Sequence, residues 1–452
     1  MLEVNEMSDI LAIIEPFVDK ALKMGADEVE LFTQKVHTKT ANFESNNMKS
    51  AVASIIDGIG IRVLKNKALG FASTNSLDKI KIEDALKEAL AIAKVTPPEN
   101  NYFLSTKQKI TKIPEMYDKA IESFSMDDTI SYSKKLLETT IGYDPRVTVD
   151  SGTFSSMIRD SAIANSNGVN ISETKSIFSW MLFGMAVDGK DIGSVDYCFD
   201  SVVKVSDINI EHTATIFAQK VLRNLNAQKT ESFEGVAVLT PDAVTDLFWL
   251  LVLASTATQV QAGSSFLQDK LGDKIAVEDL SIVDDGTIKG QTASSSFDRE
   301  GIPHKKYNII NKGVFTGVLY DTFTANKENL ESTGHAAGSY RNIPNIWTTN
   351  LNIRPGTKSY TELISEIDHG ILINRISASP NPISGDFSAV LKGAQLIRNG
   401  EIKDTLREIT AVGNIFANLN TITGISKEQV PLRGNQSWLV PYIVMDKIKF
   451  VC

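Results

Sequence analysis

Cysteine and histidine are scarce in this chain, which narrows the metal and redox chemistry open to it. Only Cys198 and Cys452 occur among 452 residues, too few for a disulfide framework and without the paired spacing of a structural zinc site. This cysteine usage fits a reducing compartment. No HExxH segment occurs, and no two of the five histidines lie within 30 positions of each other; they are His37, His212, His304, His335 and His369. The local sequence therefore offers no zinc site.

Long apolar runs and basic patches are also missing. The longest apolar run, residues 247–254, is much shorter than the roughly 20 residues that span a bilayer. The N-terminal residues are acidic and lack the basic segment and the cleavage site of a secretory signal, so we expect a cytoplasmic protein. The net charge of −9 and the dispersed lysines argue against direct binding to nucleic acid or to an anionic membrane.

Three common catalytic or nucleotide-binding motifs are absent or incomplete. Residues 184–191 (GMAVDGKD) resemble part of a phosphate loop, but Asp191 stands where Ser or Thr would bind magnesium, and the DG pair predicts a hairpin. Residues 57–63 (DGIGIRV) lack the third glycine of a dinucleotide fingerprint and do not open a helix. No serine occupies a GxSxG elbow. These patterns predict no nucleotide-binding or serine-hydrolase site.

The length and the patterns together predict an α+β protein of two domains. A chain of 452 residues exceeds the size at which a single core stops growing. We expect an N-terminal mixed α/β domain with an antiparallel sheet over residues 1–230, with subsegments of about 1–112 and 113–230. We expect residues 231–452 to form a mainly β domain, barrel-like or a sandwich, with a buried helix.

Turn and capping residues carry the prediction for the N-terminal domain. An amphipathic helix precedes Gly25, and a strand is expected to begin near Glu28. Asn66 marks a hairpin tip, and a second helix is expected to be capped by Ser125 or Asp127. The turn sequences NSNG at 165–168 and DGK at 188–190 predict an antiparallel meander.

The C-terminal half contains three stretches rich in glycine and small polar residues, namely 298–328, 332–339 and 379–402. Such density is typical of tight turns and of backbone that closely approaches another group. A β-fold that bends at each glycine accounts for it, and so does a groove through which a peptide backbone passes. The sequence leaves both interpretations open.

These stretches carry a resemblance to a known family. "DREGIP", "LYDTFTA", "STGHAAGS" and "SGDFS" occur in order with "NGEI", and the N-terminal "GADEVELF" and "GIGIRVLKNKALGFAST" precede them. In this order they resemble the TldD/PmbA family, in its PmbA (TldE-type) branch, over nearly the whole chain. The resemblance implies one subunit of a zinc-dependent cytoplasmic peptidase that acts on unstructured peptides. The family is associated with maturation of peptide antibiotics and removal of an antitoxin, hence the name "modulator of DNA gyrase".

The resemblance also implies where a zinc site would lie. In this family the TldD-type subunit holds zinc on an HExxxH segment and a downstream cysteine. Ungapped placement on residues 264–288 puts Phe248 at the first His, Trp249 at the Glu and Leu253 at the second His, with the cysteine position near Ile425 or Ser426. These side chains do not bind zinc or activate water. We therefore expect a non-catalytic chain without a cofactor, zinc in the partner subunit, and an enclosed structural helix over 244–258.

Three hypotheses follow for the function. In the first, this chain dimerises with a TldD-type protease subunit and shapes a peptide channel, whose lining residues are predicted to be Asp298, Arg299, His304, His335 and Arg341. In the second, it is a stand-alone peptidase that binds metal through His304, His335 and nearby carboxylates. In the third, it is a homodimeric peptide-binding protein.

Overall fold

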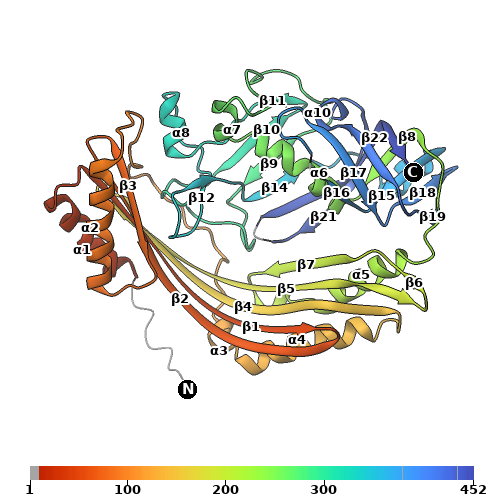
Figure 1. Cartoon of the computed structure of the whole chain (residues 1–452), viewed down its shortest axis with the longest axis horizontal. Coiled ribbons are helices and arrows are strands. Elements are labelled where there is room, and N and C mark those ends of the chain that lie inside the picture. The colour runs from red at the N-terminus through yellow and green to blue at the C-terminus, as the bar shows by residue number, and fades with distance from the viewer. Residues whose placement is uncertain (1–9, 379, 435) are drawn as a thin grey trace.

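The computed structural model describes residues 10–378, 380–434 and 436–452, and its architecture confirms the α+β class. The N-terminal half builds one antiparallel sheet, in which β7 and the short β6 both pair with β5. Its spatial order from one edge is β3 (Ala68–Thr74), β2 (Asn47–Lys65), β1 (Glu28–Glu44), β4 (Val147–Asn165), β5 (Asn170–Asp188), β6 (Asp191–Ile192), with β7 (Asp196–Val202) beside β5. Figure 1 shows the long strands of this sheet curving beneath the C-terminal half.

Turn chemistry accounts for this meander. Asn66 and Lys67 both have positive φ in the tight turn between β2 and β3, and asparagine tolerates this conformation better than most residues. The NSNG turn joins β4 to β5, so that Ala164 faces Asn170, and the DGK turn joins β5 to β6. The predicted hairpins are therefore confirmed.

Helices cover one face of the sheet and leave its concave face for the C-terminal half. Odd-numbered residues of β1, such as Val29 and Phe43, belong to the cores beneath the helices. The even-numbered Phe32 joins instead a cluster with Phe297 and Tyr340 of the C-terminal half. The helices are α1 (Ile10–Lys23), α2 (Lys79–Val95), α3 (Ala120–Ser123), α4 (Met126–Ile141, with Ser125 in a capping box) and α5 (Ile210–Arg223).

The C-terminal half is built on a mixed sheet that packs around a helix. The sheet comprises β8 (Phe233–Leu239), β9 (Ile282–Asp285), β10 (Lys306–Asn311), β11 (Val314–Phe315), β14 (Asn350–Ile353), β15 (His369–Ile373), β16 (Arg375–Ala378), β17 (Asp386–Lys392), β18 (Gln395–Arg398), β19 (Glu401–Thr405), β20 (Thr410–Asn414), β21 (Ile422–Leu432) and β22 (Ser437–Val451). A small separate sheet pairs β12 (Ala336–Ala337) with β13 (Asn345–Ile346). The helices are α6 (Pro241–Ala254), α7 (Ala257–Gln261), α8 (Thr322–Lys327), α9 (Tyr360–Ser365) and α10 (Ile415–Asn418).

Helix α6 begins and ends for local chemical reasons. Thr240 caps its first turn and Pro241 occupies the first helical position, where the missing N–H costs nothing. At the other end, the hydroxyl groups of Ser255 and Thr256 donate to the carbonyl oxygens of Val252 and Leu253. Such bonds compete with helix continuation, so α6 ends at Ala254, before the predicted end at 258. The cap at Thr240 likewise places its start at Pro241, before the predicted start at 244.

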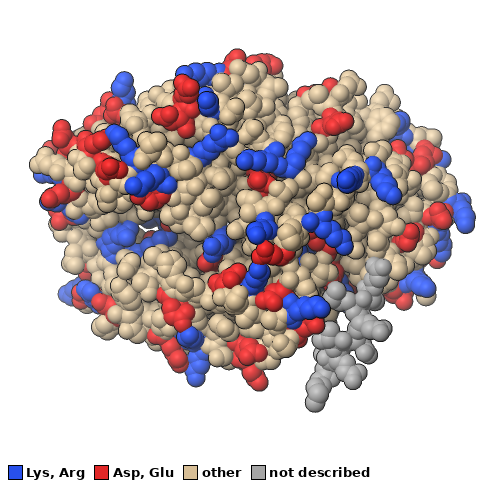
Figure 2. Space-filling model, turned by 180° about the vertical axis from the view of Figure 1, so that it is seen from behind, with Lys and Arg blue, Asp and Glu red and all other residues tan. Residues whose placement is uncertain are grey.

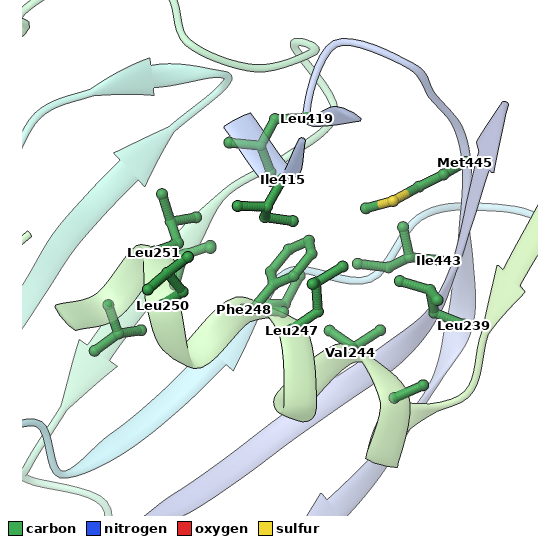
Figure 3. Packing of buried hydrophobic residues seen from close by; sticks show 14 of the residues in the cluster. Leu239, Val244, Leu247, Phe248, Leu250, Leu251, Ile415, Leu419, Ile443 and Met445 are labelled. Atoms are coloured by element: carbon green, nitrogen blue, oxygen red, sulfur yellow. The ribbon is translucent and has the colours of Figure 1, made fainter. Parts of the chain in front are cut away.

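The core around α6 is the largest in the described part of the chain. Figure 3 shows Phe248 surrounded by side chains of α6 and of the strands and helix packed on it, among them Ile415 and Ile443. Phe248 is fully buried, but Trp249 is 39% exposed and Leu253 is half-buried. The expected enclosure of the whole helix is therefore wrong, because neighbouring elements bury most of α6 but leave the stripe through Trp249 and Leu253 partly uncovered.

This packing predicts unequal effects of two truncations on α6. Phe248→Ala is expected to lower the free energy of unfolding by about 3–5 kcal/mol, because it opens a cavity in a close-packed core. Trp249→Ala is expected to cost clearly less, because its side chain is 39% exposed. Urea unfolding of both variants checks this, and equal losses would contradict the assignment of a buried and an exposed face.

Candidate functional site

The positions that correspond to a zinc site lie in a packed apolar region. Phe248, Trp249 and Leu253 of α6 offer no nitrogen, sulfur or oxygen ligand beyond the indole N–H, which is a donor. Helix α6 packs against β21, where Ile425 is buried. The Ser426 hydroxyl is fully buried, donates to the Glu428 carbonyl at 2.8 Å and accepts from the Tyr442 N–H at 2.9 Å. These residues do not fit a zinc ion.

Metal-ligating side chains are dispersed in the part of the chain that the structure describes. No three His, Cys, Asp or Glu side chains come together there in a geometry that holds a metal ion. Both nitrogens of His335 already have partners, since Nδ1 lies 2.8 Å from the Thr333 hydroxyl and Nε2 lies 3.0 Å from Asp284 Oδ2. Thr349 also binds that carboxylate through its N–H and its hydroxyl. His335 therefore belongs to a buried structural network.

A hollow of about 270 Å³ lies between the concave face of the N-terminal sheet and the C-terminal half. Three of the five predicted channel residues, Asp298, Arg299 and His304, line it. His335 is not among its lining residues, and Arg341 is exposed, with Nε donating to the Tyr340 hydroxyl at 3.1 Å. The structure thus brings three of the five residues together and places the other two elsewhere.

Arg299 belongs to a buried ion cluster that joins the two halves of the chain. Arg62 on β2 donates to Glu30 on β1 at 2.9 Å and to Glu300 at 2.7 Å, and Arg299 Nη1 donates to Glu30 at 2.9 Å. All four side chains are at most 5% exposed. Burial opposes ionisation of Glu30, yet the charges of Arg62 and Arg299 hold its pKa below the usual value. We call these four residues the ion cluster.

Tyr340 fixes the same junction by packing on glycine. Its ring lies so close to Gly58 on β2 that a β-carbon there would stand within 2.6 Å of three ring atoms, and its carbonyl oxygen similarly approaches Gly60. Only glycine permits this approach. The GIG sequence at residues 58–60, which resembled part of a nucleotide fingerprint, therefore provides the surface on which Tyr340 of the C-terminal half packs.

Two basic side chains of the hollow come from the sheet itself and have no ionic partner among the described residues. Arg159 on β4 and Lys175 on β5 lie directly opposite each other in the antiparallel register. Burial lowers the pKa of Arg159, and it lowers the pKa of Lys175 to about 8. The nearby Glu173 is bound instead to the Ser295 hydroxyl and the Ser296 N–H. Neither Arg159 nor Lys175 is among the site residues predicted from the sequence.

The two remaining titratable groups of the hollow differ in how they are held. Asp298 accepts N–H bonds from Glu300, Ile302 and Ala336, while burial and the charge of Glu300 raise its pKa to about 8. Burial and the neighbouring His335 lower the pKa of His304 to about 3. His304 is therefore neutral at physiological pH and adds no positive charge to the hollow.

A larger hollow of about 860 Å³ adjoins the first. It lies between β5 and the segment that precedes α3, with Lys107, Lys109 and Lys112 in its lining. Glu173 and Phe297 line both hollows. On the face shown in Figure 2, basic and acidic residues are interspersed. No described helix is long and apolar enough to cross a membrane.

Comparisons with known proteins identify one family over most of the chain. Models of the PmbA/TldA metallopeptidase family match three segments: domain 1 at residues 29–93, the central domain at 119–225 and the C-terminal domain at 234–451. An uncharacterized protein of Methanocaldococcus jannaschii is 29% identical over 92% of this chain and 94% of its own length. Metalloprotease PmbA of Escherichia coli O157:H7 is 25% identical over 89% of each chain.

Solved structures share the fold. TldE from Thermococcus kodakarensis superposes with a TM-score of 0.90 at 24% identity, covering 97% of this chain and 100% of that one. A candidate modulator of DNA gyrase from Thermotoga maritima gives 0.87 at 23% identity, covering 97% and 99%. At this identity the likeness shows the fold, with its curved sheet and its helix-centred C-terminal half.

The ion cluster leads to a stability prediction. Arg62→Met is expected to cost about 3–5 kcal/mol in the free energy of unfolding, because it leaves the buried Glu300 without a cationic partner and Glu30 with Arg299 alone. Lys358→Met is the control, since Lys358 pairs with Glu366 on the surface, where such pairs contribute at most about 1 kcal/mol. Urea unfolding compares them, and similar losses would contradict the role given to the cluster.

His304 leads to a pH prediction. Its pKa in the folded protein, about 3, lies below that of an unfolded histidine, so the unfolded chain binds the additional proton first. The free energy of unfolding should therefore fall as the pH is lowered from about 6.5 towards 4. His304→Gln should make this fall smaller. Chemical unfolding at several pH values measures it, and an unchanged slope would contradict a buried neutral His304.

Proposed function

Because this chain belongs to the PmbA/TldD metallopeptidase family, we propose that it is the non-catalytic subunit of a two-subunit zinc peptidase. One observation carries the proposal: apolar or otherwise bonded side chains occupy every position where the family's zinc ligands are expected. Without those ligands or a carboxylate beside them, α6 has no group that activates water. Zinc and catalysis are then supplied by a TldD-type partner.

The edge of the long sheet supports association with that partner. Residues 59–65 of β2 pair with β3, but residues 47–58 pair only with β1 among the described strands. Along this unpaired edge Val52, Ile55 and Ile56 are 53%, 60% and 42% exposed. Unpaired strand edges with exposed apolar side chains readily pair with another chain. We assign this edge to the partner subunit.

The two adjoining hollows support the role of this chain towards the peptide. They lie against the concave sheet and are lined by polar, basic and apolar groups, which suits an extended chain with varied side chains. In this proposal the partner cuts the peptide and this subunit holds it.

Hydrolysis of an unstructured peptide tests the division of labour. We expect no cleavage by this chain alone, little by an HExxxH-bearing partner alone, and chelator-sensitive cleavage by the mixture. Cleavage by this chain alone would overturn the proposal and favour a stand-alone peptidase. A mixture no more active than the partner alone would also overturn it.

The edge assignment leads to a separate prediction. Ile55→Lys is expected to weaken association with the partner about 10-fold or more, because it places a charge in an apolar interface. Val95→Lys is the matched control, since Val95 is 82% exposed at the end of α2, away from the edge. Sedimentation of the mixed subunits measures both affinities. Equal affinities of the two variants would place the interface elsewhere.

A further inference from the structure

The paired bases of the smaller hollow form an arrangement that the fold alone does not explain. Like charges directly opposite each other on neighbouring strands are destabilising, and Arg159 and Lys175 occupy such a pair. Among the described residues, the Arg159 side chain donates only to the Met157 sulfur, at 3.6 Å, and the Lys175 ammonium donates to the Thr292 carbonyl at 3.5 Å. Neither contact supplies negative charge.

The acidic groups around them form no ion pair with either base. Glu173 accepts from Ser295 and Ser296, and Asp298 accepts three backbone N–H bonds. The charge of Glu173 favours protonated Lys175 from nearby, but it is one negative charge beside two bases. The ion cluster balances two arginines with two glutamates. Even so, Nε and Nη2 of the buried Arg299, which also lines the hollow, have no acceptor in the described structure. The hollow therefore contains arginine and lysine N–H donors that lack a charged acceptor.

We propose that this hollow is a carboxylate pocket, in which Arg159 and Lys175 bind the C-terminal carboxylate of the peptide. A carboxylate offers the acceptors that the two bases lack, and charge-assisted bonds of this kind are among the stronger ones in proteins. The volume of about 270 Å³ suits the end of a chain, while the adjoining hollow of about 860 Å³ takes the residues before it. The proposal rests on the peptide-binding function given above.

Binding of three labelled peptides to the full chain tests the pocket. The first has a free C-terminal carboxylate, the second has the same sequence with an amidated C-terminus, and the third is amidated but carries a glutamate side chain. We expect the free acid to bind about 10- to 100-fold more tightly than the plain amide. Equal affinity of the amidated glutamate peptide and the free acid would overturn the assignment to the chain terminus.

Variants of the two bases tie the effect to the pocket. Arg159→Gln and Lys175→Gln should abolish the preference for the free acid, whereas Lys175→Arg should keep part of it. Lys134→Gln, which removes an exposed lysine from α4, is the control and should change nothing. Loss of binding to all peptides in the two Gln variants alone would point to general damage and overturn the assignment.

The stability of the two Gln variants distinguishes ligand binding by Arg159 and Lys175 from a structural role of these side chains. Because the two bases repel each other without a ligand, either Gln variant should unfold at an equal or higher urea concentration than the natural chain. Groups that hold the fold together would give the opposite result. A lower unfolding midpoint in both variants would therefore overturn the proposal.

Proton uptake gives a second, independent readout. Burial lowers the pKa of Lys175 to about 8, while Arg159, Glu173, Asp298 and His304 surround it. A bound carboxylate raises that pKa and also the pKa of Asp298, which is about 8 in the free chain. Binding of the free acid at pH 8 should therefore take up protons, and Lys175→Gln should reduce this uptake to the share of Asp298. Calorimetry in buffers of different ionisation enthalpy measures it. If the acid and the amide bind equally, the pocket assignment fails and peptide binding stands; if no peptide binds, both fail.

Discussion

The buried ion cluster is the interaction on which the arrangement of the molecule depends. Glu30 and Arg62 come from neighbouring strands of the N-terminal sheet, while Arg299 and Glu300 come from a loop more than 230 residues later. Buried charges are tolerated only when each one is paired with an opposite charge. The cluster therefore favours the one relative position of the C-terminal half and the sheet in which all four charges are paired. Tyr340, packed on Gly58, fixes the same junction by shape. Arg299 also lines the smaller hollow, so the cluster forms part of its wall.

The sequence predicted the parts of the structure that local chemistry decides. Asn66, the NSNG turn and the capping residue Ser125 each specify a conformation through their own backbone and side-chain preferences, and the structure confirms them. The apolar run of α6 predicted a helix in the C-terminal core. The exposure of Trp249 did not follow from the run, because an apolar sequence does not tell which side its neighbours leave uncovered.

The sequence predicted only part of the candidate site, again because local patterns do not show which residues meet in space. Asp298, Arg299 and His304 stood out because they lie among glycine turns, and all three line one hollow. Arg159 and Lys175 lie within strands and look like residues of a solvated face. A signal was nevertheless present: the NSNG turn sets a register in which these two bases face each other. The ion cluster gave no local signal, because its members meet only after the two halves pack.

We propose that α6 replaces a catalytic zinc site with an apolar core, so that this subunit holds the peptide while its partner cleaves it. Zinc content distinguishes this role from catalysis by the chain itself. We would measure zinc by mass spectrometry in this chain purified alone and in its complex with an HExxxH-bearing partner. We expect no zinc above background in this chain and one ion per pair in the complex. One zinc ion per molecule of this chain alone would contradict a non-catalytic role.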